Sequence, residues 1–293
     1  MQPISRRNFL RNGAFGLTAV ALGAGRGFDL FGQPLGIPIG LELWTVRREL
    51  EEDFVGTLKK VAAIGYKKVE MFTFYDRKAS EIRRILGDIG LTCPSAHYVT
   101  PMMKSGWEKH IEYAGEVGIQ YMVCAILDPS ERRSLDDYRK LADLFNKVGE
   151  QCKKAGIQFA YHNHNFEFKS YGGVLGYDEL LRRTDPELMK VQMDCFWVTH
   201  AGRDPVAYFR RLGERIHLLH IKDLKAGNPP TTTMDPRVGL FAEVGHGEIN
   251  WTRIFNAARN TGVKHYYVEQ DECERPPLES IKISYDYLEN LKL

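Results

Sequence analysis

The sequence predicts one α/β domain folded as a (β/α)₈ TIM barrel over residues 35–293. Short apolar runs alternate with amphipathic helical stretches along this whole region. Eight such strand–helix units fit into about 255 residues, the size of a TIM barrel. The segment 43–47 after the first strand lacks the glycine-rich phosphate turn expected of the alternative, an open doubly wound sheet.

Each expected strand is a short apolar run bounded by turn residues or by the end of a helix. The eight runs cover residues 37–43, 67–72, 91–97, 121–127, 157–161, 188–194, 216–221 and 265–269. Their length and apolar character favour strands that are covered by helices, as in a parallel barrel.

The helices are predicted from apolar positions at helical spacing and from residues that start and stop helices. One first helix is expected to carry Leu50, Phe54, Leu58 and Val61 and to end at Gly65. The predicted helix starts are the N-caps Ser80, Ser134 and Asn250, the pair Asp204-Pro205, and residue 277 of the closing helix. The long loop 223–247 is expected to cover the substrate.

Composition excludes several classes of protein. The chain has 293 residues, 43% of them hydrophobic, so it can bury the core of one barrel-sized domain. A net charge of +2 without a clustered basic face disfavours binding to nucleic acid. Five widely spaced cysteines without a Cys-x-x-Cys pair disfavour a zinc ribbon or a disulfide scaffold.

The first 34 residues are expected to be a signal and a disordered leader. The pair Arg6-Arg7 precedes an uncharged stretch, 14–25, that is rich in Ala, Gly and Leu, which resembles a Tat export signal. This stretch is too short and glycine-rich for a stable membrane span. The alternative is a basic N-terminus with a chance apolar run. The signal predicts a periplasmic or otherwise exported mature chain that begins between residues 26 and 35.

Polar side chains end most of the predicted strands. In a barrel the active site forms at the carboxyl ends of the strands, so these residues are the candidates for function. They are Glu42, Glu70, His97, His162, His164, Glu167, Asp194, His220 and Glu269. Carboxylates and imidazoles that converge on one mouth require a compensating cation, which a divalent metal ion would supply.

Four of these residues, one from each of four successive strands, form the expected metal site: Glu167, Asp194, His220 and Glu269. An oxygen-rich set with one nitrogen suits Mn²⁺, Mg²⁺ or Co²⁺ better than a structural Zn²⁺ site. Each residue also has an ordinary structural explanation. Asp194 could cap a helix, His220 could be a buried core histidine, and Glu269 could be a loop carboxylate.

Several motifs resemble the xylose-isomerase-like barrel superfamily, in particular its sugar phosphate isomerase/epimerase group. The resemblance covers the chain from about residue 37 to its end. The similar stretches are Gly65-Tyr66-Lys67-Lys68-Val69-Glu70, Ser95-Ala96-His97, Tyr161 to Phe168, Met193-Asp194 with Trp197, His220-Ile221-Lys222-Asp223, Gly245-His246-Gly247 before Trp251, and Val268-Glu269. This combination is specific for the superfamily and much less specific for a substrate.

The resemblance implies an isomerase or epimerase that binds one divalent ion, preferentially Mn²⁺, with Mg²⁺, Co²⁺ or Zn²⁺ as alternatives. The ion would be held by the four ligands named above, and proton transfer would pass through an enediolate, with Glu167 and Glu269 as acid and base. Residues expected to contact the sugar are Trp44, Glu70, His97, His162, Trp197 and Lys222. Packing of the two tryptophans at the barrel mouth is the alternative reading.

One departure from the family pattern leaves the reaction open. Members of the group place the strand-five metal carboxylate inside the strand, where this chain has Tyr161. Either Glu167 is then the ligand, or His162 or His164 replaces it. If a histidine such as His164 is the catalytic base, a lyase or hydratase acting on 3-keto sugars or glycosides is the alternative reaction.

Two other classes are less favoured. A nuclease similar to endonuclease IV would need further histidines for three zinc ions, and Trp197 stands where one is expected. A sugar-binding barrel without activity is the third possibility. We expect a small sugar as the partner, unphosphorylated for an exported enzyme, with no nucleic acid and no stable membrane span. The resemblance is compatible with a homo-oligomer.

Overall fold

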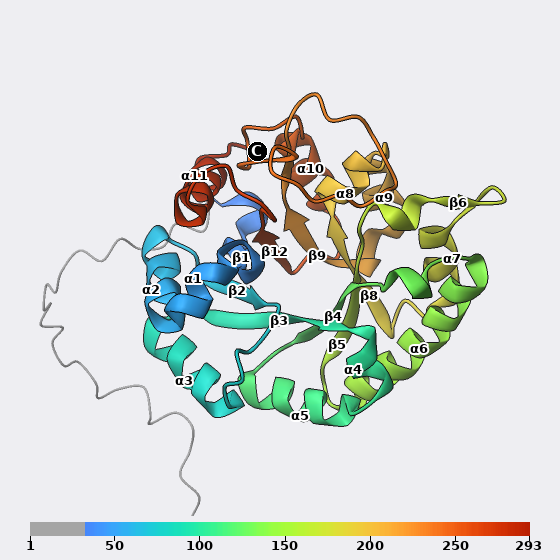
Figure 1. The fold of residues 1–293 in the computed structure, drawn as a ribbon, viewed down its shortest axis with the longest axis horizontal. Coiled ribbons are helices and arrows are strands. Elements are labelled where there is room, and N and C mark those ends of the chain that lie inside the picture. The colour runs from blue at the N-terminus through green and yellow to red at the C-terminus, as the bar shows by residue number, and fades with distance from the viewer. Residues whose placement is uncertain (1–32) are drawn as a thin grey trace, which may run out of the picture.

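Eight parallel strands close into a barrel in the computed structural model, which describes residues 33–293 (Figure 1). Around the barrel the strands follow the order β1-β12-β9-β8-β5-β4-β3-β2. They are β1 Gly40–Glu42, β2 Lys68–Met71, β3 Thr92–Val99, β4 Tyr121–Ile126, β5 Gln158–His162, β8 Met189–Asp194, β9 Ile216–Ile221 and β12 His265–Val268. The predicted TIM barrel is therefore confirmed.

Helices surround the barrel and cover the outer faces of its strands (Figure 1). The larger ones are α2 Phe54–Ile64, α3 Ala79–Ile89, α5 Trp107–Val117, α6 Leu135–Lys154, α7 Gly176–Arg183, α9 Pro205–Leu212, α10 Trp251–Ala258 and α11 Pro277–Glu289. Shorter helices follow the carboxyl ends of three strands: α1 Arg47–Glu52, α4 Thr100–Lys104 and α8 Cys195–His200. Within residues 33–293 no helix has the length and apolar character needed to cross a membrane.

Local sequence signals located most helix starts but not all of them. Ser134, Asp204 and Asn250 each accept a hydrogen bond from a backbone N–H of the helix that they precede, as predicted. The cap at Ser80 is wrong, because the N-cap is Lys78, two residues earlier, and α3 begins at Ala79. The single first helix is also wrong. The chain breaks at Asp53, whose carboxylate accepts from Gly56 N at 2.8 Å and starts α2.

The loop 223–247 contains more structure than the sequence indicated. Its two ends pair as short antiparallel strands, β10 Asp223–Leu224 and β11 Phe241–Ala242. A second small hairpin, β6 Ser170–Tyr171 with β7 Val174–Leu175, lies between β5 and α7. The predicted export signal falls on residues 1–34, of which residues 1–32 lie outside the described part of the chain. It stays a prediction.

Candidate metal centre and active site

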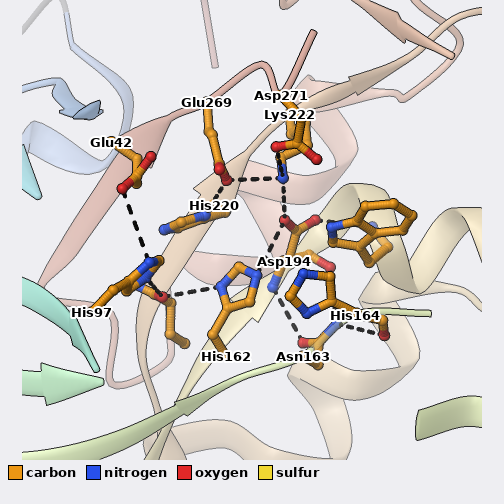
Figure 2. A network of polar contacts seen from close by, with 12 residues as sticks. Glu42, His97, His162, Asn163, His164, Asp194, His220, Lys222, Glu269 and Asp271 are labelled. Carbon is orange, nitrogen blue, oxygen red and sulfur yellow. Dashed lines mark hydrogen bonds and ion pairs between the residues drawn. The ribbon is translucent and has the colours of Figure 1, made fainter. Parts of the chain in front are cut away.

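The ionisable residues at the strand ends converge at one end of the barrel, as Figure 2 shows. Seven strands contribute to this group, and its central members are completely buried. Because these side chains are buried away from solvent, the charge of each must be balanced by a neighbouring group. The contacts below show how these charges are balanced.

His220, on β9, connects the carboxylates of two other strands. Its Nε2 lies 2.6 Å from Glu70 Oε2 and its Nδ1 lies 2.7 Å from Glu269 Oε2. Burial alone would lower the pKa of His220, but the carboxylates of Glu269 and Glu70 outweigh burial and raise it to about 10. The imidazolium in turn helps to hold the pKa of both carboxylates well below the usual range, against the effect of burial.

Lys222 provides the second buried positive charge. Its Nζ lies 2.8 Å from Glu269 Oε2, 2.8 Å from Asp271 Oδ1 and 3.3 Å from Asp194 Oδ2. Burial would lower the pKa of Lys222, but these three carboxylates raise it well above its ordinary value. Lys222 is therefore ammonium, and its three N–H groups are already engaged by carboxylates.

Asp271 belongs to the site although the sequence gave no reason to choose it. It follows β12 by three residues, lies in the acidic run 269–274, and is 8% exposed. Burial raises the pKa of Asp271 to about 7, although Lys222 opposes this shift. It can thus exchange a proton near neutral pH. Its position two residues after Glu269 was the available signal.

Three of the four predicted metal ligands come together. Donor atoms of Asp194, His220 and Glu269 lie within 4.8 Å of one another, and all three residues are buried. Asp194 Oδ1 accepts from Trp197 N at 2.9 Å, so Asp194 does cap α8, while its buried Oδ2 forms an ion pair with Lys222 Nζ at 3.3 Å. Two buried carboxylates and one imidazole whose donor atoms lie this close together are the ligand types that a divalent cation prefers.

Glu167 is not part of this group. Its two oxygens accept hydrogen bonds from the Tyr161 hydroxyl and, at 2.9 Å, from His164 N, which turns the carboxylate away from Asp194. Burial raises the pKa of Glu167 to about 7. The physical reason is local: residues 166–168 form a 3₁₀ turn after β5, which directs Glu167 back to the strand and not into the barrel mouth. The Glu167 carboxylate thereby stabilises the turn formed by residues 164–167.

His162 is the residue of β5 that approaches the cluster. Its Nε2 lies 3.7 Å from Asp194 Oδ2, and a second group of donor atoms within 4.8 Å joins His97, His162 and His220. Burial, with further repulsion from His220, lowers the pKa of His162 well below its ordinary value, so the ring is neutral. A neutral imidazole on β5 can complete the ligand set where Glu167 does not.

Gln192, which the sequence analysis missed, determines which nitrogen of His162 carries hydrogen. The Gln192 amide donates to Glu70 Oε1 at 2.7 Å, and this fixes the orientation of the amide because a carboxylate only accepts. Gln192 Oε1 then accepts from His162 Nδ1 at 3.0 Å and from His97 Nε2 at 2.9 Å. The His162 Nε2 lone pair therefore faces Asp194. Side chains alternate between the two faces of β8, so Gln192 lies on the same face as Asp194. This alternation could have identified Gln192 as a site residue from the sequence.

His164 is the second neutral imidazole at the site. Burial and the positive charge of Lys222 lower the pKa of His164 well below its ordinary value. Its ring stacks on Phe166 with centroids 5.3 Å apart, and its buried Nδ1 has no hydrogen-bond partner. A neutral ring with an unengaged nitrogen that lines a cavity is suited to accept a proton.

A cavity of about 300 Å³ opens above these groups. Among the predicted substrate contacts, Trp44, His97, His162 and Lys222 line it, together with Glu42, His164, Glu269 and Asp271. Glu70 and Trp197 are fully buried and do not line the cavity. Trp197 packs between Phe196, Phe241 and His164, which agrees with the alternative of barrel-mouth packing. Glu70 acts on the site through His220.

Fold and site together define a TIM barrel that gathers buried carboxylates, imidazoles and a lysine at the carboxyl ends of its strands. Residues 58–291 match the Xylose isomerase-like TIM barrel family, and the chain belongs to that family.

Among curated relatives, an inosose dehydratase of Lacticaseibacillus casei is 22% identical over 269 residues, covering 82% of this chain and 90% of the relative. Among solved structures, a sugar phosphate isomerase/epimerase from Parabacteroides distasonis ATCC 8503 is 26% identical with a TM-score of 0.73, covering 86% of this chain and 94% of the other. The IolI protein with a bound zinc atom shares the fold at 14% identity, with a TM-score of 0.68 and coverage of 85% and 96%.

Proposed function

We propose that this protein is a divalent-metal-dependent dehydratase of keto-cyclitols or keto sugars, a lyase that removes water next to a carbonyl group. The observation that carries the proposal is that the neutral His164, whose buried Nδ1 has no hydrogen-bond partner, lines the same cavity as Asp271 and Lys222. A base and an acid on one cavity are what β-elimination of water requires. The inosose dehydratase relative supports this reaction over the isomerase that the motifs first suggested.

Asp194, His220 and Glu269 would hold the metal ion, with His162 Nε2 as the fourth ligand in place of the predicted Glu167. A bound divalent ion would polarise the substrate carbonyl and so acidify the neighbouring C–H bond. For His220 to bind the ion, one of its nitrogens must leave Glu70 or Glu269 and lose its proton. The zinc atom of the IolI protein supports a divalent ion at a barrel of this kind.

The chain's own residues account for the proton transfers. His164 Nδ1 takes the proton from the carbon beside the carbonyl, since burial keeps this imidazole neutral. Asp271, whose pKa burial raises to about 7, acts in its protonated form: it gives its proton to the departing hydroxyl group, which leaves as water, and the carboxylate that remains pairs with Lys222. Lys222 stays charged and balances Asp194 and Glu269 throughout. One proton is taken and one is given, so the reaction is balanced.

An isomerase or epimerase is the second candidate, favoured by the structure from Parabacteroides distasonis. It would share the first proton abstraction and differ in returning the proton to carbon. A phosphorylated substrate is not supported, because Lys222 is the only lysine or arginine that lines the described cavity and three carboxylates neutralise it. Export through the Tat pathway also stays part of the proposal.

The first prediction concerns reaction and metal together. Purified protein incubated with an inosose should form a product that is one water molecule lighter, detected by mass spectrometry. Treatment with a chelator should abolish turnover, and Mn²⁺ or Zn²⁺ should restore it, because the proposed ion polarises the substrate carbonyl. Interconversion of ketose and aldose without loss of water would instead establish the isomerase.

The second prediction separates His164 from the metal ligands. His164→Gln should reduce kcat by about 10²–10⁴-fold, the range for a general base, while the protein keeps its metal content. His162→Gln should lower the metal affinity itself by about 10–100-fold. Metal analysis of both variants beside steady-state kinetics distinguishes the two roles. Loss of metal from the His164 variant would contradict the assignment.

A further inference from the structure

The cavity combines a polar floor with an apolar outer wall. Its floor carries the groups described above, whereas the wall consists of Trp44, Phe72, Met102, Ile126, Met234 and Pro236. Trp44 and Phe72 follow β1 and β2, Met102 lies in α4, Ile126 ends β4, and Met234 and Pro236 lie in the loop between β10 and β11. Of these six side chains only Trp44 offers a hydrogen bond, through its indole N–H, and the polar residues that line the cavity outside the floor are Tyr98 and Glu272.

The position of each wall residue follows from the direction of its strand. Trp44 comes two residues after Glu42, and Phe72 comes two residues after Glu70. Met102 comes five residues after His97. Parallel barrel strands run toward the mouth, so the residue that follows a floor residue lies farther out. The apolar wall therefore surrounds the entrance to the polar floor.

Trp44 and Met102 are unusual in their exposure. Each is 39% exposed, and they are two of the four large hydrophobic residues exposed within residues 33–293. Exposed apolar side chains gathered at one mouth indicate a binding surface. The Trp44 ring is also held in place, because the Arg47 guanidinium lies 4.5 Å from its centroid and Phe72 contacts it edge-to-face at 5.0 Å. A fixed aromatic ring loses little entropy when a ligand binds.

A bare sugar or cyclitol can place a C–H face on the Trp44 ring, but it gains little from the rest of this wall. Its hydroxyl groups need hydrogen-bond partners, and burying them against methionine, phenylalanine and proline side chains would cost free energy. An apolar ring gains free energy by burial against the same surface. The polar floor already supplies the partners that one sugar ring requires.

We propose that the preferred substrate carries an apolar, ring-shaped substituent next to the sugar or cyclitol ring, so that the floor binds the polar ring and the wall binds the substituent. This proposal rests on the proposed function for the position of the reacting ring. It assigns Trp44 and Met102 as the residues that set specificity. A second copy of this chain is the competing occupant of the wall.

Two unreactive probes test the proposal without turnover: phenyl β-D-glucopyranoside and methyl β-D-glucopyranoside, titrated by calorimetry into the full-length protein. The phenyl probe should bind more than about tenfold tighter, since its ring adds apolar surface to bury. Trp44→Ala and Met102→Ser should each bring the ratio of the two affinities closer to one. Val174→Ser is the matched control, because Val174 is 41% exposed on the β6–β7 hairpin and does not line the cavity.

Equal binding of the two probes, or an unchanged ratio in the Trp44 and Met102 variants, overturns the proposal. So does a wild-type dimer in sedimentation that Trp44→Ala converts to monomers, since the wall would then be a subunit interface. Dehydration of an inosose by a protein that does not prefer the phenyl probe would leave the proposed function standing. A phenyl preference without any dehydration would contradict only the proposed reaction.

Discussion

Gln192 illustrates how a neutral side chain can organise charged ones. One amide contacts Glu70, His97 and His162, and each of these contacts fixes a hydrogen position or a ring orientation. Because the amide cannot ionise, it imposes this arrangement without adding charge to a site that already contains many carboxylates. The His162 lone pair that faces Asp194 is the result.

The third prediction tests Gln192 as a positioning residue. Gln192→Leu should reduce kcat or metal affinity by about 10–100-fold, because His162 then loses the acceptor that selects its tautomer. The free energy of unfolding should fall by about 1–3 kcal/mol, which is the cost of buried polar groups left without hydrogen-bond partners. Gln192→Glu keeps an acceptor oxygen for the two imidazoles and should retain more metal than the Leu variant. Equal metal titrations for both variants would contradict this role.

Asp223 holds the segment between β9 and α10 in its folded conformation. Its carboxylate accepts hydrogen bonds from Gly245 N at 2.9 Å, Ile249 N at 3.1 Å and Trp251 Nε1 at 2.8 Å, and from two further backbone N–H groups. The motif around Gly245-His246-Gly247 therefore has a structural reason. A Cβ at Gly247 would lie 2.2 Å from Asp223 Oδ1, so only glycine leaves the carboxylate its place.

The fourth prediction follows from these contacts. Asp223→Ala should destabilise the protein by about 3 kcal/mol or more, because several buried donors lose their acceptor together. The loop that carries Met234 and Pro236 should also become more susceptible to proteases. Urea unfolding and limited proteolysis measure the two effects. Asp235→Ala, in the same loop but exposed and paired only with Arg237, should change stability by less than about 0.5 kcal/mol.

Across the whole molecule, burial keeps histidines neutral at both ends of the barrel. At the carboxyl ends His220 is charged because two carboxylates contact it, whereas His162 and His164 are neutral. At the amino ends His217 and His265 are neutral. Burial, assisted by nearby lysines, lowers the pKa of each of these two to about 4. Lys68 Nζ donates to His265 Nδ1 at 2.8 Å, and the Tyr121 hydroxyl lies 3.1 Å from His217 Nδ1. Protonation would place a positive charge beside Lys68.

The fifth prediction concerns stability and pH. The folded-state pKa of His217 and His265 is lowered from 6.5, so between pH 6.5 and 4 the unfolded chain binds more protons and stability falls as the pH falls. Protonation of these two residues should lower the free energy of unfolding by about 2 kcal/mol in total between pH 6.5 and 4, allowing for partial solvent screening. The double variant His217→Gln/His265→Gln should lose less stability over this window in urea unfolding. If the free energy of unfolding fell equally with pH in the wild-type protein and in the double variant, the assignment would be contradicted.

The order of elements could be predicted from the sequence because it depends on local patterns. The boundaries of β9 and the caps at Ser134, Asp204 and Asn250 were found because apolar spacing and capping groups act over a few residues. The strand-end rule also located Asp194, His220 and Glu269, since a closed parallel barrel brings such ends together. The break at Asp53 was missed because it interrupts a stripe that stays apolar on both sides.

The sequence by itself thus determined the barrel and the family resemblance, and it selected three residues, Asp194, His220 and Glu269, that the structure brings together. Only the tertiary structure decided that Glu167 turns back to Tyr161 and His164, that His162 approaches Asp194 in its place, and that Gln192 and Asp271 belong to the site. The physical reason is that periodicity specifies which face of a strand a side chain occupies, whereas its partners come from strands far apart in the chain and are defined only when the barrel closes.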